Sequence, residues 1–168
     1  MAVGTNQGLE IDHGGALHEV SEARTISEAR IRAEDLRADL VQRGVLADAL
    51  RFCKEELLVS NYFQAVLETV NSVMDKARSK SGLKEDRAAL NDKALSGECP
   101  LVQINSMSTD SERSEQKGFA NLLRGVAEIL RTTTAHEACI HWNMSEDGAE
   151  DLLSMASLIH RRLDRAII

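Results

Sequence analysis

The stretch FANLLRGVAEILRTTTAH, residues 119–136, decides the fold. Its apolar residues recur every three or four positions, at Phe119, Leu122, Leu123, Val126, Ile129 and Leu130. This period predicts an amphipathic helix with one face in a hydrophobic core. At about 100° per residue, Arg124, Glu128 and Arg131 fall together on the opposite face. The polar face is therefore expected to lie outside the core of the subunit.

The same period predicts further helices over about 25–44, 45–59, 62–80 and from 145 to the C-terminus. The expected core stripes are Ile31, Leu36 and Leu40; Leu46, Leu50, Cys53 and Leu57; Phe63, Val66, Val70, Val73, Met74 and Ala77; and Leu152, Leu153, Ala156, Ile159 and Leu163. Between 83 and 108 the pattern is weaker, with a short helix at DRAALNDKAL and an extended segment at PLVQINSM. The sum is a single all-α bundle of about five helices with short irregular connections.

Local signals fix several of the expected helix ends. Gly44 and Gly82 follow the last periodic residue of their helices, as glycines that end helices do. Thr109 and Glu112 have the spacing of a capping box, in which each side chain binds the other's backbone N–H. Thr25 and Glu28 repeat this spacing before the first helix.

Composition limits the class of protein. The 168 residues suffice for one domain that buries about 70% of its unfolded surface. Aromatic residues are only 3%, so the core must be built from aliphatic side chains. The net charge of −7 argues against a simple electrostatic nucleic-acid binder, but a small basic pocket remains compatible with it.

The termini and cysteines point to a cytoplasmic protein. Residues 1–18 are rich in glycine and contain acidic residues but no lysine or arginine, so we expect a flexible acidic tail before a helical domain at 19–168. No signal peptide and no apolar run of about 18 residues is present, so no membrane association is expected. The cysteines Cys53, Cys99 and Cys139 lack paired spacing and indicate reduced, buried thiols.

The end of the opening stretch, RTTTAH, predicts a helix junction. Threonine is β-branched and has poor helix propensity, and Thr134 repeats the capping-box spacing with Glu137. We therefore expect one helix to end near Arg131 and another to begin near Thr134. His136 would then lie in a first helical turn, where the local field attracts phosphate and keeps an imidazole neutral. Such a histidine beside an arginine suits phosphodiester chemistry.

Two other interpretations of this stretch remain open. An arginine in a last helical turn commonly serves the helix dipole, and a histidine in a short turn commonly makes a structural hydrogen bond. His136, Cys139 and His141 also have the spacing of metal ligands, but a fourth ligand is missing, so no metal and no cofactor is expected.

Three longer segments carry a family resemblance: YFQAVLETVNSVMDKARSKSGL, EQKGFANLLRGVAEILRTTTAHEACIHW and DLLSMASLIHRRLDRA. Together they resemble the prokaryotic Ymh-type hypothetical protein family of the HEPN superfamily, over roughly residues 40–166. The most specific block is formed by Gln116, Gly118, Leu122, Leu123, Gly125, Arg131 and His136. The resemblance implies a helical HEPN domain that dimerises.

The resemblance also implies an activity. Many HEPN domains are metal-independent endoribonucleases of toxin–antitoxin, abortive-infection and other phage-defence systems, with an Arg-x4–6-His motif at the dimer interface. Arg131 and His136 match this motif as phosphate-binding group and general base, and Thr132 and Thr133 are weaker candidates for orienting substrate. Expected partners are RNA, a second copy of the chain, and an antitoxin or other defence protein.

Two positions depart from the family pattern. Thr132 stands where the family usually has asparagine, and Asn71 stands where lysine is frequent. Together with the net charge of −7, Thr132 favours the alternative of a non-catalytic HEPN-type interaction module or antitoxin partner. A zinc-stabilised helical adaptor using His136, Cys139 and His141 is the third hypothesis.

Overall fold

The computed structural model describes residues 8–11, 17–20, 26–59, 62–85, 87–136 and 144–168, with side chains from Ile26 onward except at 56, 87 and 130–136. The described elements are β1 (Gly8–Ile11), β2 (Leu17–Val20), α1 (Ile26–Gln42), α2 (Ala47–Leu50), the 3-10 turn η1 (Glu55–Leu57), α3 (Phe63–Ser81), α4 (Arg87–Leu95), α5 (Asp110–His136) and α6 (Glu146–Asp164). The prediction of an all-α bundle is confirmed, with one short hairpin added.

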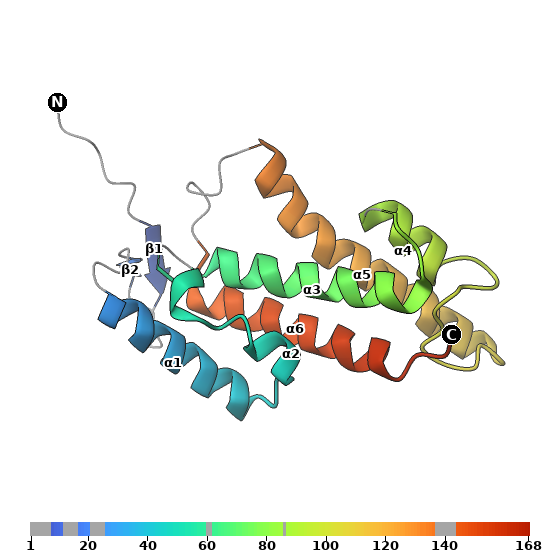
Figure 1. Ribbon diagram of the computed structural model, residues 1–168, viewed down its shortest axis with the longest axis horizontal. Coiled ribbons are helices and arrows are strands. Elements are labelled where there is room, and N and C mark those ends of the chain that lie inside the picture. Colours follow the sequence, from blue (N-terminus) through green and yellow to red (C-terminus); the bar gives the residue numbers. More distant parts are fainter. Residues whose placement is uncertain (1–7, 12–16, 21–25, 60–61, 86, 137–143) are drawn as a thin grey trace.

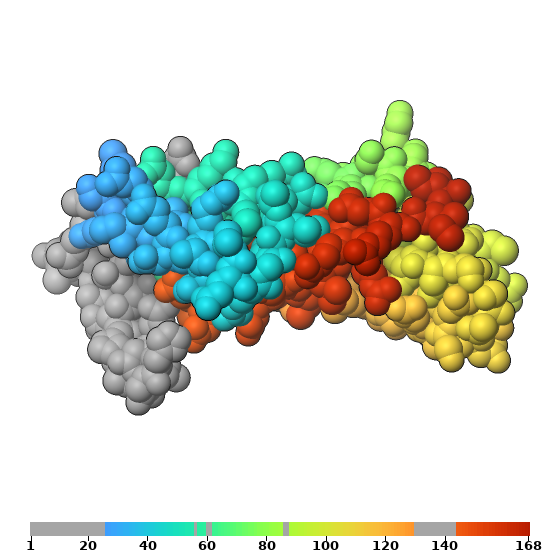
Figure 2. Space-filling view, turned by 90° about the horizontal axis from the view of Figure 1, so that it is seen from below, coloured from blue at the N-terminus to red at the C-terminus, as the bar shows by residue number. Residues whose placement is uncertain are grey.

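A parallel pair of helices, α3 and α6, forms the centre of the bundle (Figure 1). Their common direction follows from two contacts, because Ser72 meets His160 and Lys76 meets Asp164 one turn further along both helices. The helices α1 and α2 pack on α6, while α4 packs on α3 and α5. Figure 2 shows α1, α2 and α6 together on one face of the molecule.

The core is aliphatic, as the low aromatic content requires. The predicted stripe of α3 is buried throughout, from Phe63 to Ala77. In α6, Leu153, Ile159 and Leu163 are fully buried, and Leu152 is half-buried. Each such leucine or isoleucine contributes about 1.5–3 kcal/mol through burial. No described helix is both long and apolar enough to cross a membrane.

The helix ends predicted at Gly44, Gly82 and Thr109 are confirmed. Gly44 and Gly82 follow α1 and α3 with φ of 71° and 69°, the left-handed conformation that glycine adopts without strain. At the start of α5, the amide N of Glu112 donates to the Thr109 hydroxyl at 3.2 Å. The amide N of Thr109 donates back to the Glu112 carboxylate at 3.0 Å, which completes the capping box. Thr25 lies outside the described residues.

The single helix predicted over 45–59 is wrong. The chain forms α2, then turns, and then forms η1. Two arginines of α1 explain the interruption: Arg37 donates to the Leu50 carbonyl at 3.0 Å, and Arg32 donates to the Leu58 carbonyl at 2.9 Å. These donors satisfy carbonyl groups at the ends of the two short elements, so the turn leaves fewer backbone groups without partners.

Several side chains predicted to be buried are exposed. In α1, Ile31 is 55% exposed because Ala29, Ala33, Leu36 and Leu40 form the inward stripe. In α5, Ile129 is 47% exposed, although it continues the apolar period. Cys53 is buried as expected, whereas Cys99 is exposed in the loop after α4; Cys139 lies outside the described residues.

The segment between α3 and α5, where the helical pattern of the sequence is weak, contains one helix and one long loop. In the predicted stretch DRAALNDKAL, Arg87–Leu95 form α4, which confirms the short helix predicted there; Asp86 lies outside the described residues. The segment PLVQINSM forms no strand, and only Gln103 pairs with Ile167 in an isolated antiparallel bridge. This bridge ties the loop to the C-terminal end of the chain.

The N-terminal hairpin was not predicted. The strands β1 and β2 pair antiparallel, with Gly8 opposite Val20 and Ile11 opposite Leu17. Glycines around the strands mask the short alternation of apolar residues, so the pattern of residues 1–18 indicated no element.

Candidate functional site

The predicted junction at Thr132–Thr134 is absent, and this expectation is wrong. Helix α5 runs without interruption from Asp110 to His136. The low propensity of threonine costs only about 0.5 kcal/mol per residue, which a long packed helix readily tolerates. Arg131, Thr132, Thr133 and His136 therefore lie on the last two turns of one helix, although their side chains are outside the described set.

The continuous helix reverses the electrostatic setting that the sequence suggested for His136. This residue is the last of α5, and the C-terminal end of a helix carries partial negative charge. Such an end favours cations and attracts no phosphate by itself. The described part of α5 therefore places no helix N-terminus beside His136.

The exposed face of α5 carries two glycines. Gly118 and Gly125 are exposed, and a Cβ added at either would meet no described atom within 4 Å. Leu122 is half-buried and Ile129 is 47% exposed on neighbouring positions. The glycines of the family block are therefore not required by packing within the described part of the subunit.

The predicted polar face of α5 is only partly free of the subunit. Arg124 is exposed and forms an ion pair with Asp92 of α4. Glu128 is half-buried. Arg124 therefore helps to attach α4 to α5, a role that its position on the helix did not reveal.

Gln116 is the member of the family block with the clearest structural role. Its side chain is 2% exposed, and its amide N donates to the carbonyl groups of Leu95 and Val102 at 2.9 and 3.0 Å. Its amide O accepts from the amide N of Ile104 at 2.9 Å. Gln116 therefore holds the loop between α4 and α5 against α5. The signal in the sequence was a glutamine at a core position of the helical period.

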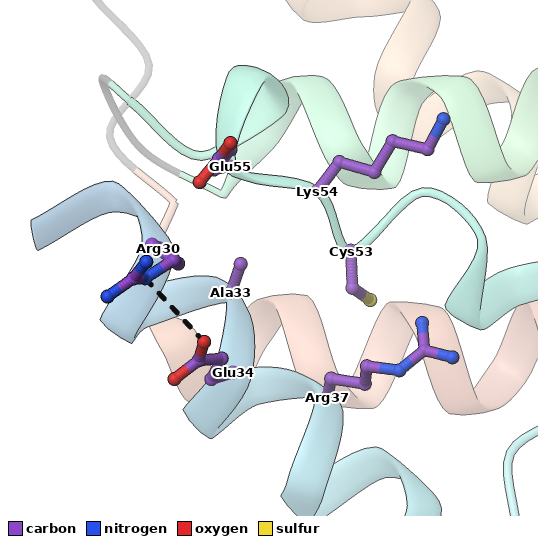
Figure 3. Close-up of a pocket in the computed structure, with 7 residues that line it drawn as sticks. All are labelled: Arg30, Ala33, Glu34, Arg37, Cys53, Lys54 and Glu55. Carbon is purple, nitrogen blue, oxygen red and sulfur yellow. Dashed lines mark ion pairs between the residues drawn. The ribbon is translucent and has the colours of Figure 1, made fainter. Parts of the chain in front are cut away.

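A hollow of about 400 Å³ lies between α1 and the segment that joins α2 to η1 (Figure 3). Its lining is Arg30, Ala33, Glu34, Arg37, Cys53, Lys54 and Glu55. Three cations and two carboxylates share the lining, and Arg30 pairs with Glu34 at 3.7 Å. Both partners are largely exposed, so this ion pair contributes little to stability.

The hollow lacks an activated nucleophile among its lining residues. Figure 3 shows Cys53 between α1 and Lys54. Burial raises the pKa of the Cys53 thiol to about 11, with a smaller opposing effect from Arg37. Because the thiolate is the reactive form, Cys53 is a poor nucleophile near neutral pH. The hollow offers mixed surface charge without an evident reaction.

No group of three metal-ligating side chains occurs in the part of the chain that the structure describes. The metal hypothesis used His136, Cys139 and His141. Residues 139 and 141 lie outside the described ranges, and the side chain of His136 is not described. The zinc adaptor therefore stays a hypothesis.

A second polar cluster lies inside the bundle and was not predicted. His160 of α6 is 1% exposed, and its Nε2 lies 3.1 Å from the Ser72 hydroxyl of α3. Its Nδ1 lies 3.7 Å from the carboxylate of Asp48 in α2. The helical period of the sequence places His160 on the core face of α6, because it is seven residues after Leu153 and four after Ala156, both core residues.

A family model matches most of the chain. A family model described as a protein of unknown function, Hypoth_ymh, matches residues 43–163. No curated protein and no solved structure matches the chain. The matched residues run from the end of α1 almost to the end of α6 and include all of α5.

Proposed function

We propose that this chain, which belongs to the Hypoth_ymh family, is a HEPN-type endoribonuclease that needs no metal. It acts in the cytoplasm as a homodimer, in a toxin–antitoxin or phage-defence system of the abortive-infection type. Arg131 binds the scissile phosphate, and His136 is the general base. Thr132 and Thr133 help to orient the substrate.

The observation that carries the proposal is the continuity of α5. The family block from Gln116 to His136 lies on one helix within the matched residues. His136 is five positions after Arg131, so the two positions are about 7.5 Å apart along the axis and about 140° apart around it. A continuous helix keeps this spacing fixed within each copy of the chain.

The same spacing supports a site built from two copies. Positions about 140° apart on one helix point to different sides, so a phosphate near one position lies away from the other. In a homodimer whose twofold axis lies beside this end of α5, the arginine position of one copy can lie next to the histidine position of the second copy. The exposed glycines of α5 leave room for close approach of another helix.

The reaction follows from the two side chains. His136 takes the proton of a ribose 2′-hydroxyl, and the 2′-oxygen attacks the adjacent phosphorus. Arg131 stabilises the negative charge on the phosphate oxygens. The bond from phosphorus to the 5′-oxygen breaks, and the proton that His136 has taken passes to that oxygen. The products are a 2′,3′-cyclic phosphate and a 5′-hydroxyl.

The test is cleavage of a mixed RNA pool by purified protein in EDTA. Parent protein should yield cyclic-phosphate ends, and Arg131→Ala and His136→Ala should each lose about 10²–10⁴-fold in rate. Arg124→Ala is the matched control, because Arg124 is an exposed arginine of the same helix that pairs with Asp92. Equal loss in the Arg124 variant would contradict a specific role for Arg131.

A non-catalytic interaction module is the second candidate. The net charge of −7 favours it, because RNA binding gains affinity from clustered cations. Thr132 favours it as well, because its hydroxyl cannot replace the two-donor amide of asparagine. Intact RNA with all variants at micromolar dimer would support this module and contradict the endoribonuclease.

A further inference from the structure

His160 of α6 is enclosed by polar groups from α2 and α3. Its imidazole is 1% exposed, with Ser72 of α3 at Nε2 and Asp48 of α2 facing Nδ1. The Nδ1 atom has no hydrogen-bond partner in the described part of the protein. At 3.7 Å, the Asp48 oxygen is beyond hydrogen-bond distance. A buried polar atom without a partner is costly, so this arrangement calls for an explanation.

The hydrogen bond of Ser72 settles which nitrogen carries the proton. The Ser72 hydroxyl donates its one hydrogen to the Thr69 carbonyl at 2.7 Å. Its oxygen can then only accept from His160, so Nε2 is the protonated atom at 3.1 Å. In the neutral ring, Nδ1 therefore presents a lone pair toward the Asp48 carboxylate, and two acceptors face each other.

Charged groups from α2, α3 and α6 surround this imidazole. Lys76 of α3 donates to Asp48 at 2.6 Å and to Asp164 of α6 at 2.7 Å, and Arg51 follows α2. Burial lowers the pKa of His160, and Lys76 and Arg51 lower it further, while Asp48 and Asp164 oppose them. The ring is therefore neutral at pH 7 and gains its proton only in more acidic solution.

We propose that His160 is a proton-operated switch in which proton uptake at Nδ1 transfers Asp48 from Lys76 to His160. The proton comes from solvent and converts Nδ1 from an acceptor into a donor. Asp48 needs to move by only about 1 Å to reach hydrogen-bond distance. Lys76 keeps Asp164 as its partner, so no buried cation is left alone.

The switch acts on α2, which is well placed to move. This helix is a single turn, Ala47–Leu50, and the Asp48 side chain is 40% exposed. The C-terminal residue of α2, Leu50, accepts the hydrogen bond from Arg37, which lines the hollow of Figure 3. The segment that forms one wall of that hollow directly follows α2 in the chain.

The first experiment is NMR of protein labelled with ¹⁵N-histidine, with His160→Gln used to assign the signal. We expect the Nε2–H form at pH 7.5 and a protonation midpoint below that of an unstructured histidine peptide. In Asp48→Asn the midpoint should fall further, because the acceptor for the new proton loses its charge. The Nδ1–H form at pH 7.5, or an unchanged midpoint in Asp48→Asn, would overturn the proposal.

The second experiment measures the partner exchange itself. Asp48→Asn and Lys76→Met, singly and together, give the coupling between the two residues in a double-mutant cycle of urea unfolding. The coupling free energy should be large at pH 7.5 and should decrease at pH values below the protonation midpoint of His160. In a His160→Gln background the coupling free energy should stay constant with pH. A coupling that does not change with pH in the parent protein contradicts the switch. Neither experiment depends on ribonuclease activity.

Discussion

The side-chain amide of Gln116 donates to the backbone carbonyl of Val102 across 3.0 Å and joins α5 to the loop that follows α4. With the bonds to Leu95 and Ile104, one buried side chain satisfies three backbone groups. Gln116→Ala should lower the free energy of unfolding by about 3 kcal/mol, because these groups lose their partner. Urea unfolding followed by circular dichroism measures the loss.

Lys117→Ala is the control for this prediction, since Lys117 is the exposed neighbour on the same turn. It should change the free energy of unfolding by less than about 0.5 kcal/mol. If Gln116→Ala were as mild as Lys117→Ala, water or a rearranged loop would have to satisfy the three backbone groups. Gln116 would then not hold the loop against α5.

The capping carboxylate of α5 predicts a change in stability at acid pH. Hydrogen bonds from the hydroxyls of Ser108 and Ser106 and the amide of Thr109 lower the pKa of Glu112 from 4.5 to about 2. A lowered pKa gives stability that is present above 4.5 and is lost as pH falls toward 2. The melting temperature of Glu112→Gln should therefore vary less between pH 2 and pH 5 than the melting temperature of the parent protein.

Glu98→Gln provides the comparison, because Glu98 is an exposed carboxylate in the loop after α4. The parent and Glu98→Gln should lose stability in parallel over this range. A parallel loss in Glu112→Gln would show that another carboxylate controls the acid transition.

A buried carboxylate at the start of α6 predicts the opposite pH dependence. Glu150 is 4% exposed, and burial raises its pKa despite its ion pair with Arg43. Arg43→Ala should destabilise the protein by about 1 kcal/mol at pH 7, a modest value because the Arg43 side chain is 44% exposed. The loss should shrink at pH 4, where Glu150 can take up a proton instead. Unfolding curves at both pH values measure it.

The sign follows from linkage. A raised pKa in the folded state gives stability that is present below the unfolded value and is lost as pH rises through the folded value. Arg43→Lys keeps a cation and should recover part of the loss at pH 7. A loss that is the same at pH 4 and pH 7 would mean that Arg43 does not act through the charge of Glu150.

The exposed glycine Gly125 predicts a stabilising substitution in the isolated subunit. A Cβ at this position meets no described atom within 4 Å, and alanine is favoured over glycine inside a helix by about 1 kcal/mol. Gly125→Ala should therefore raise the melting temperature of the monomer. Sedimentation at the same concentrations shows whether it also weakens a dimer.

Gly148→Ala is the contrasting substitution, because its Cβ would lie 3.3 Å from the Ser145 hydroxyl that caps α6. Gly148→Ala should raise the melting temperature less than Gly125→Ala does. Destabilisation by Gly125→Ala at concentrations that favour association would indicate that a second chain covers this face.

Much of the fold is readable in the sequence. The stripe of α3 from Phe63 to Ala77, the glycine after it at Gly82 and the capping box at Thr109 are local patterns, and the structure contains each of them. They succeed because helix period and capping depend on residues within a few positions of one another. The family block was likewise recognisable before the structure.

The candidate site at Arg131 and His136 was harder to predict from the sequence, because its geometry depends on the length of α5. The threonines after Arg131 favoured a junction by propensity, but the helix continues to His136. Propensity is a weak effect of a few tenths of a kcal/mol per residue, and packing along a 27-residue helix exceeds it. The error reversed the expected field at His136.

The sequence by itself determined the helical class, most helix boundaries and the aliphatic core, since these follow from short-range periodicity and capping. Only the tertiary structure decided where α2 stops, because Arg37 reaches the Leu50 carbonyl from 13 residues away. It also decided the surroundings of His160, whose partner Ser72 is 88 residues distant in the chain. Such contacts depend on how helices pack against each other, and no local pattern of residues encodes them.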